Sequence, residues 1–247
     1  MLDLIGSIVG MAAIAIDLVA FTSALGGTPW RRLALAAVVG GWVGLANHLA
    51  ATGQLAFSTS RIVPGIAGLF GVPLLAVGAL ALGSRKVRAA LLAVPTPTLI
   101  ALNALRVLGV LFLFLAADGR LSGPFPYSAA IGDIVTGALA IPLALSVARG
   151  QASARAIRNW NLFGALDLIA AVGFGLTSAN GSPIHLFHVG VGSQAMQYLP
   201  YALVPTVLVP FYLVTHAVIA AQLAHTRVEP TPRGARAGWR EAGTATT

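Results

Sequence analysis

The sequence contains no cysteine, a single lysine and few charged residues of any kind. The absence of cysteine excludes disulfides, thiolate metal ligands and cysteine nucleophiles. Charged residues make up 9% of the 247 residues, whereas about 25% is usual for a soluble domain. Hydrophobic residues make up 57% of the chain, which is more apolar surface than a soluble fold of this length can bury. The composition therefore predicts an integral membrane protein.

Seven apolar segments are long enough to cross a bilayer as helices, for which about 20 residues are needed. They cover roughly residues 4–26, 33–52, 62–83, 96–117, 127–148, 160–179 and 200–223. Short connections join them, so we expect one all-α transmembrane domain over residues 1–225 and a disordered basic tail over 226–247. Residues 1–10 contain Asp3 but no Lys or Arg, which predicts a retained first helix rather than a cleaved signal peptide.

Basic residues are distributed unevenly between the connections. Of the 15 Lys and Arg residues, twelve lie in the connections 27–32, 84–95 and 149–159 and in the tail. These regions alternate along the chain with connections that carry only Arg61 and Arg120. By the positive-inside rule, the distribution predicts an N-terminus outside and a C-terminus in the cytoplasm. It also explains the sequence pI of about 11.3 without a nucleic-acid partner.

The segment 180–199 is apolar enough to suggest an eighth span. An eighth span would place the arginine-rich tail outside, against the charge distribution. Ser182 followed by Pro183 is a typical helix start, with a capping hydroxyl and proline at the first helical position. We therefore predict a short extra helix on the outer face, before the last span.

Ionisable residues inside membrane spans are strong pointers to function because they are costly there. Five of the predicted spans contribute to a possible substrate or proton path, formed by Asp17, Asn103, Arg106, Asp133, Asp167 and His216. Most of these residues share a helix face with glycine or another small residue, and His48 shares one with Gly40 and Gly44. Because small residues mark helix contacts in membranes, we expect these faces to point into the bundle.

Counting from the predicted helix ends assigns a depth to each ionisable residue. His48 and Asp133 fall in the outer half, Arg106 and Asp17 near the midplane, and Asp167 and His216 in the inner half. A lone buried guanidinium is costly, so Arg106 is expected to pair with Asp133, Asp17 or Asp167. Such pairing is compatible with a purely structural role as well as with a functional one.

Three classes of function fit these residues. The first is binding or transport of a small solute or protons along the interior carboxylates and His216. The second is a haem- or metal-binding membrane protein, an oxidoreductase or hydrolase, with ligands from His48, His185, His188 and Asp133. The third is a structural subunit of a homo-oligomer or a larger membrane complex. A retinal Schiff base on the last helix is excluded because Lys86, the only lysine, lies in a connection.

Two segments carry a resemblance to a known family. The stretches IGDIVTGALA at 131–140 and WNLFGALDLIAAVGFG at 160–175 resemble those of uncharacterised bacterial multi-pass membrane proteins, over roughly residues 100–220. The matching residues are Gly132, Asp133, Trp160, Asn161, Gly164 and Asp167. The resemblance implies a multi-pass fold in a bacterial inner membrane and marks Asp133 and Asp167 as defining polar residues, but it implies no activity.

Overall fold

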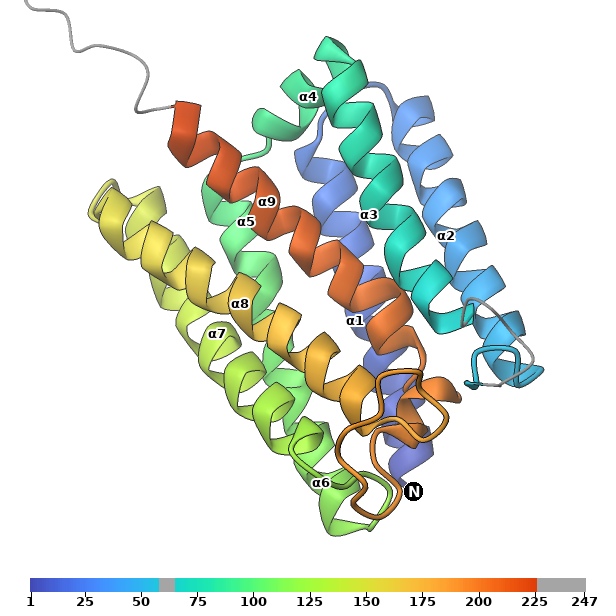
Figure 1. The fold of residues 1–247 in the computed structure, drawn as a ribbon. Helices are drawn as coiled ribbons and strands as arrows, with labels where there is room; N and C mark the ends of the chain where they lie inside the picture. The colour runs from blue at the N-terminus through green and yellow to red at the C-terminus, as the bar shows by residue number, and fades with distance from the viewer. Residues whose placement is uncertain (58–64, 226–247) are drawn as a thin grey trace, which may run out of the picture.

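The computed structural model describes residues 1–57 and 65–225, and every regular element in these ranges is helical (Figure 1). The predicted tail and Arg61 lie outside the described residues. Seven helices within the described ranges are long and apolar enough to cross a membrane. The all-α bundle of seven candidate spans is therefore confirmed.

Four of the spans are single α-helices with few interruptions: α1 (Leu2–Ala24), α2 (Pro29–Ala51), α7 (Phe125–Ala148) and α8 (Ala154–Ser178). The third, α3 (Gly65–Gly83), contains Pro73. The fourth is composite, with α5 (Thr96–Leu102), the 3₁₀ segment η1 (Asn103–Gly109) and α6 (Val110–Ala117). The last combines the π-helical turn η3 (Val204–Leu208) with α9 (Val209–His225).

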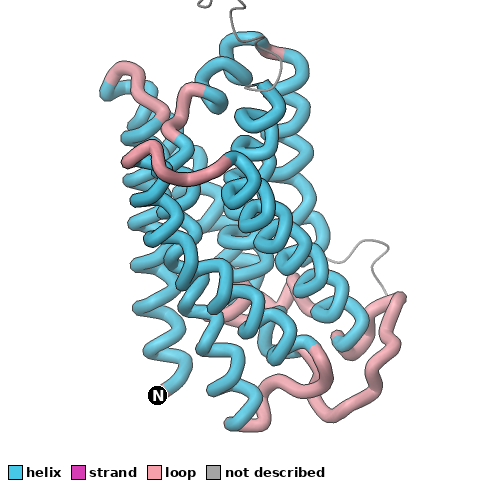
Figure 2. Tube along the Cα trace, turned by 90° about the vertical axis from the view of Figure 1, so that its left-hand side faces the viewer, coloured by secondary structure: helices cyan, strands magenta, loops and turns pink. Residues whose placement is uncertain are grey.

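The long helices run side by side and their connections gather at two ends of the bundle (Figure 2). The N-terminus and the segment 179–203 lie at one end, and the connections rich in basic residues lie at the other (Figure 1). A short helix that the sequence pattern does not predict, α4 (Arg85–Leu92), carries three of the basic residues. Ser84 caps it by accepting a hydrogen bond from the Val87 amide. This arrangement matches the alternation of charge along the chain, while the side of the membrane stays a prediction.

The N-terminal end of α1 is fixed by an ion pair at the bundle surface. Arg120 Nη1 lies 2.7 Å from Asp3 Oδ1, and this hydrogen bond raises the pKa of Arg120 above its usual value. The guanidinium also lies over the Tyr201 ring, 5.3 Å from its centroid. These contacts join the start of α1 to the turn after α6 and to the residues before the last span.

The fourth and seventh spans both depart from α-helical geometry in their interiors. In the seventh, Pro210 has no N–H to donate to the carbonyl of Thr206, four residues earlier. The indole Nε1 of Trp42 in α2 donates to that carbonyl instead, at 3.0 Å. The last span therefore contains a π-helical turn close to Pro210, and a neighbouring helix stabilises it.

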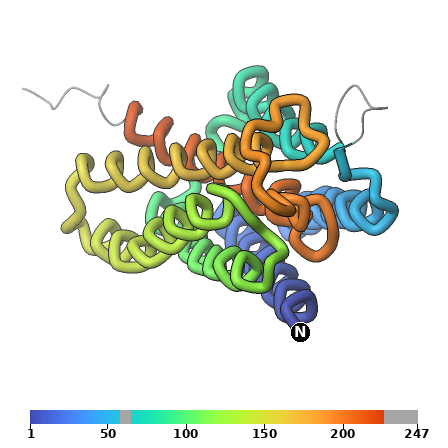
Figure 3. Tube along the Cα trace, turned by 60° about the horizontal axis from the view of Figure 1, so that its bottom comes forward, coloured from blue at the N-terminus to red at the C-terminus, as the bar shows by residue number. Residues whose placement is uncertain are grey.

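The helix predicted to begin at Ser182 and Pro183 does not form. Residues 179–193 are an irregular loop, and the extra helix before the last span is only the 3₁₀ turn η2 (Gln194–Gln197). Figure 3 shows this segment winding across the end of the bundle. Its backbone bonds to other parts of the chain, with the Leu186 amide donating to Thr177 O at 2.8 Å and the Ser122 amide to Gly192 O at 2.9 Å. These contacts replace the helix that the local sequence predicts.

The small-residue face of α2 also differs from its prediction. Gly40, Gly44 and His48 are exposed on the outside of the bundle. A Cβ added at either glycine would meet no described atom within 4 Å. The buried face of α2 consists of Val43, Ala46 and Ala50. Here the aliphatic face, rather than the glycine face, contacts the other helices.

Candidate functional site

Arg106 lies at the centre of the candidate site, in η1, with only 2% of its surface exposed. Its Nε donates to Asp133 Oδ1 of α7 at 2.7 Å, and its Nη2 donates to Asp167 Oδ2 of α8 at 2.5 Å. Its Nη1 donates to the carbonyl of Gly164 at 3.1 Å. Because the guanidinium is planar and carries five N–H donors, one side chain can join three helices.

His216 of α9 adds a fourth helix to this arrangement. Its Nε2 lies 3.1 Å from Arg106 Nη1. A guanidinium only donates, so Nε2 accepts and the proton resides on Nδ1. Nδ1 then donates to Asn161 Oδ1 at 2.8 Å, while Asn161 Nδ2 donates back to the His216 carbonyl at 3.1 Å. This assignment makes His216 a neutral acceptor that is oriented by Asn161.

A further buried carboxylate lies beside this centre. Tyr212 of α9 donates its hydroxyl to Asp17 Oδ2 of α1 at 2.9 Å, and the Tyr212 ring lies 6.0 Å from the Arg106 Cζ. Asp17 is 2% exposed, and its Oδ1 has no hydrogen-bond partner among the described residues. Tyr212 thus connects α1 to the centre formed by Arg106.

Asn103, one 3₁₀ turn before Arg106, bonds to the last span as well. Its Nδ2 donates to Thr215 Oγ1 at 3.1 Å and to the Leu99 carbonyl at 3.0 Å. In a 3₁₀ helix, residues three apart lie directly above one another. Asn103, Arg106 and Gly109 therefore share one buried face, as their spacing predicts.

Three glycines provide the space that the charged and imidazole side chains occupy. A Cβ at Gly109 would lie 2.6 Å from Asp133 Cβ, and a Cβ at Gly164 would lie 2.6 Å from His216 Cε1. A Cβ at Gly132 would overlap the Asp167 carboxylate. Each glycine is on a different span from the side chain that it accommodates, so the close helix approach and the ionic contacts depend on one another.

The buried charges of the site do not balance. Within the described interior, Arg106 is the one guanidinium among three carboxylates, from Asp17, Asp133 and Asp167. Arg106 bonds directly to two of these carboxylates, and the third bonds to a neutral phenol. An unpaired negative charge is costly at this depth. Ionisation of all three carboxyl groups would therefore leave this interior with a net negative charge.

All six residues of the predicted path lie in this region, while the membrane depth of each stays a prediction. Asp133 and Asp167 contact the same guanidinium, and His216 lies beside it. The sequence allows three carboxylates as partners of Arg106, and the structure pairs it with two of them, Asp133 and Asp167. Sequence reasoning missed Tyr212 and Thr215, although both lie about one helical turn or less from His216 on the last span.

The structure does not gather the ligands proposed for a metal or haem. Among the described residues, no group of three or more His, Cys, Asp and Glu side chains is placed to hold a metal ion. The rings of His185 and His188 do lie together, with centroids 4.1 Å apart, but on the irregular loop. His48 is exposed on α2, and Asp133 is engaged by Arg106.

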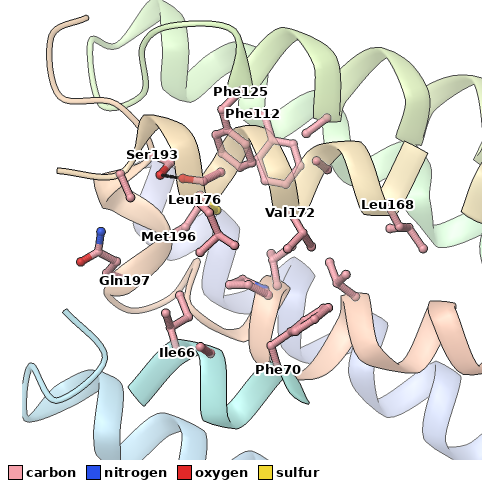
Figure 4. A pocket seen from close by; sticks show the side chains of 18 of the residues that line it. Ile66, Phe70, Phe112, Phe125, Leu168, Val172, Leu176, Ser193, Met196 and Gln197 are labelled. Atoms are coloured by element: carbon pink, nitrogen blue, oxygen red, sulfur yellow. Dashed lines mark hydrogen bonds between the residues drawn. The ribbon is translucent and has the colours of Figure 1, made fainter. Parts of the chain in front are cut away.

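A cavity of about 150 Å³ adjoins the site at Asp133 (Figure 4). It lies between α3, α7, α8, the last span and the segment 193–197, and its walls are mainly apolar. Phe70, Phe112 and Phe125 line it, together with Gln197. A second cavity, of about 70 Å³, lies beside α1 and η1 and is lined by both Arg106 and Asp133. Asp133 therefore lines both spaces, as do Phe112, Leu168, Val204 and Val209.

Seven apolar helices around a buried ionic centre define a multi-pass helical membrane protein. Residues 63–224 match the model of a family described as a domain of unknown function, DUF8737, and the chain belongs to this family. This agrees with the resemblance to an uncharacterised membrane protein family. No curated protein and no solved structure matches the chain.

Proposed function

We propose that this protein binds and moves protons, alone or together with a small solute, through the interior site around Arg106. We further infer a bacterial inner membrane as its location, from the basic residues of its connections and the family resemblance. The observation that carries the proposal is the excess of carboxylates over guanidinium in the described interior.

Charge balance gives the physical reason. In a medium of low dielectric constant, a carboxylate without a paired cation is stable only when it is protonated or when a cation approaches it. Asp133 and Asp167 share the guanidinium of Arg106, so one positive charge has to balance two negative charges. Taking up one proton would neutralise this trio. Releasing it would restore a net negative charge that attracts another proton or a cationic solute.

The backbone around the site supports movement coupled to such a change. Arg106 lies in a 3₁₀ segment and the last span begins with a π-helical turn, both of which are irregularities typical of hinges and functional sites. Protonation of Asp133 or Asp167 would weaken its bond to Arg106 and so loosen one helix contact. Because Asp133 lines both cavities, such a movement would change a wall that they share.

Reconstituted protein tests this proposal directly. We expect liposomes containing the wild-type chain to move protons down an imposed gradient, followed with an internal pH-sensitive dye. Asp133→Asn and Asp167→Asn should reduce the flux to the level of protein-free liposomes, because neither amide can carry the proton.

The matched control is Asp3→Asn, which removes a carboxylate from the surface pair with Arg120. Its flux should equal that of the wild type. Wild-type flux in both interior variants, with correct insertion shown by proteolysis, would contradict the proposal. The proposal would also be contradicted if liposomes with the wild-type chain moved protons no faster than protein-free liposomes, whether or not a small solute is added.

A further inference from the structure

The basic end of the bundle carries positive charge that no described side chain balances. Every Arg and Lys in the stretches 27–32, 84–95 and 149–159 is exposed, and these stretches contain no Asp or Glu. The ion pairs between described residues lie elsewhere, in the interior and at the end that holds the N-terminus (Figure 1). The basic end is therefore a positive surface that attracts anions.

Helix α4 carries three of these basic residues within four positions and has two different faces. Arg85, Lys86 and Arg88 are exposed on one side. Val87 and Leu91, about one turn apart, are partly buried on the other side, and Leu91 packs against the core beneath. A helix with basic residues on one face and apolar residues on the other is typical of segments that lie in the headgroup layer of a membrane.

Exposed apolar side chains place α4 beside lipid. Leu82, three residues before Arg85 at the end of α3, is 84% exposed, and Trp30, next to Arg31, is 74% exposed. Tryptophan is enriched where lipid meets water, and a leucine this exposed suits contact with acyl chains. The anion that fits α4 is therefore a phospholipid headgroup, whose acyl chains cover the neighbouring apolar surface, rather than free phosphate.

Gln222 of the last span bonds the end of α4 to α9. Its Nε2 donates to the carbonyls of Leu92 at 3.0 Å and Val94 at 2.7 Å, and its Oε1 accepts from Thr96 Oγ1 at 2.9 Å. Leu92 is the last residue of α4, where carbonyls lack partners within the helix. Because α9 also carries His216, the position of α4 is linked to a span that contributes to the interior site.

We propose that α4 is a binding site for the headgroups of anionic phospholipids, and that a bound headgroup restrains the end of the last span through Gln222. The headgroup phosphates accept hydrogen bonds from Arg85, Lys86 and Arg88, and the acyl chains lie against the apolar end of α3. The inference does not rest on the proposed proton movement, since lipid binding needs no flux.

Lipid titration of the purified full chain in a neutral detergent tests the site. The probes are phosphatidylglycerol, phosphatidylcholine with the same acyl chains, and inorganic phosphate. We expect phosphatidylglycerol to raise the thermal midpoint, measured by loss of helical circular dichroism, and the other two probes to leave it unchanged. The rise should shrink as salt is added, because salt screens exposed charges over about 10 Å at 0.1 M.

A chain that combines Arg85→Gln, Lys86→Gln and Arg88→Gln removes the charge of α4. The phosphatidylglycerol concentration for half of the maximal effect should rise about 10- to 100-fold, as expected for three basic side chains at an anionic surface. These residues are exposed, so the variant should keep the wild-type midpoint in detergent without lipid.

The matched control combines Arg149→Gln, Arg155→Gln and Arg158→Gln. It removes the same charge from the same end of the bundle and leaves α4 intact, as Figure 1 shows. Its half-maximal concentration should stay within about 3-fold of the wild-type value, because salt screens exposed charges that lie farther than about 10 Å from the bound headgroup.

Hydrogen exchange followed by mass spectrometry tests the link to the last span. In the wild type, phosphatidylglycerol should slow amide exchange in residues 85–94 and 218–225. In Gln222→Leu it should slow exchange in 85–94 alone, because the bonds that join the two segments are lost. Gln151→Leu, the same change at an exposed position of the same end, should behave as the wild type.

The proposal is overturned if phosphatidylcholine or inorganic phosphate raises the midpoint as much as phosphatidylglycerol, or if the α4 variant responds to phosphatidylglycerol as the wild type does. Equal slowing of 218–225 in the wild type and in Gln222→Leu would refute the link to the last span. A response to phosphatidylglycerol without proton flux would leave this site standing and refute the proposed function. Proton flux without that response would do the opposite.

Discussion

At the scale of single residues, the site depends on Arg106 having neighbours without side chains. A guanidinium that bonds to two carboxylates and a carbonyl needs three helices closer together than most side chains allow. Gly132 permits α7 to lie against the Asp167 carboxylate, and Gly164 permits α8 to lie against the His216 ring. The polar residues and the glycines are therefore one structural unit, in which each makes the position of the other possible.

Gly132→Ala tests this dependence. The added methyl group would overlap the Asp167 carboxylate and displace it from Arg106, at a cost of about 1–3 kcal/mol. We expect a lower thermal midpoint in detergent, measured by loss of helical circular dichroism. In an Asp167→Ala background the same change should have little effect, because the overlapping group is gone.

Gly173→Ala is the matched control for Gly132→Ala. A Cβ at Gly173 of α8 would meet no described atom within 4 Å. Alanine should therefore leave the thermal midpoint unchanged or raise it slightly, as it does in unobstructed helix interiors. Equal midpoints for Gly132→Ala and Gly173→Ala would show that the space left by Gly132 is not needed for the ionic contacts.

At the scale of helices, the number and approximate limits of the spans could be predicted from sequence, but their exact first residues could not. The sequence pattern predicts that the sixth span starts at residue 160, but α8 begins at Ala154. Asp167 therefore lies near the middle of α8, 13 residues from Ala154 and 11 residues from Ser178. Asp133 lies 8 residues from the Phe125 end of α7. The difference of three residues is about 4.5 Å of helix, which the Arg106 side chain bridges.

The irregular loop before the last span was beyond prediction for a different physical reason. Ser182 and Pro183 carry local helix-start preferences, which are worth about 1 kcal/mol for a capping residue. Their segment instead bonds to Thr177, Ser178 and Ser122. Tertiary hydrogen bonds of this kind leave no periodic signal in the sequence. The exposure of Gly40 and Gly44 on α2 could not be predicted either. Glycine spacing indicates that a helix face can form a close contact, but it does not show which helix, if any, packs there.

Trp42→Phe tests how helices compensate for an irregular neighbour. The change removes the donor to the Thr206 carbonyl, which Pro210 leaves without an N–H four residues later. An unsatisfied carbonyl of this kind costs about 1–3 kcal/mol, so the thermal midpoint should fall. Because Pro210→Ala restores an N–H, the fall should be smaller in a Pro210→Ala background. An equal fall in both backgrounds would show that the indole contributes through packing alone.

At the scale of the whole molecule, the two ends of the bundle differ in charge and in structure. Basic residues and the amphipathic helix α4 gather at one end. The opposite end carries the N-terminus and the loop 179–203, against which the larger cavity lies. If the basic end faces the cytoplasm, as the charge distribution predicts, the cavity lies toward the outside. The orientation therefore determines from which side a ligand of this cavity would arrive.

The absence of cysteine from the chain makes this orientation directly measurable. Gln151→Cys places a single thiol in the connection between α7 and α8, at the basic end, and Asn180→Cys places one on the loop at the opposite end. Both positions are exposed. We expect a membrane-impermeant maleimide to label Asn180→Cys in intact cells and to label Gln151→Cys only after the membrane is permeabilised. The reverse pattern would place the basic end outside and the cavity toward the cytoplasm, and equal labelling of both in intact cells would contradict a single orientation.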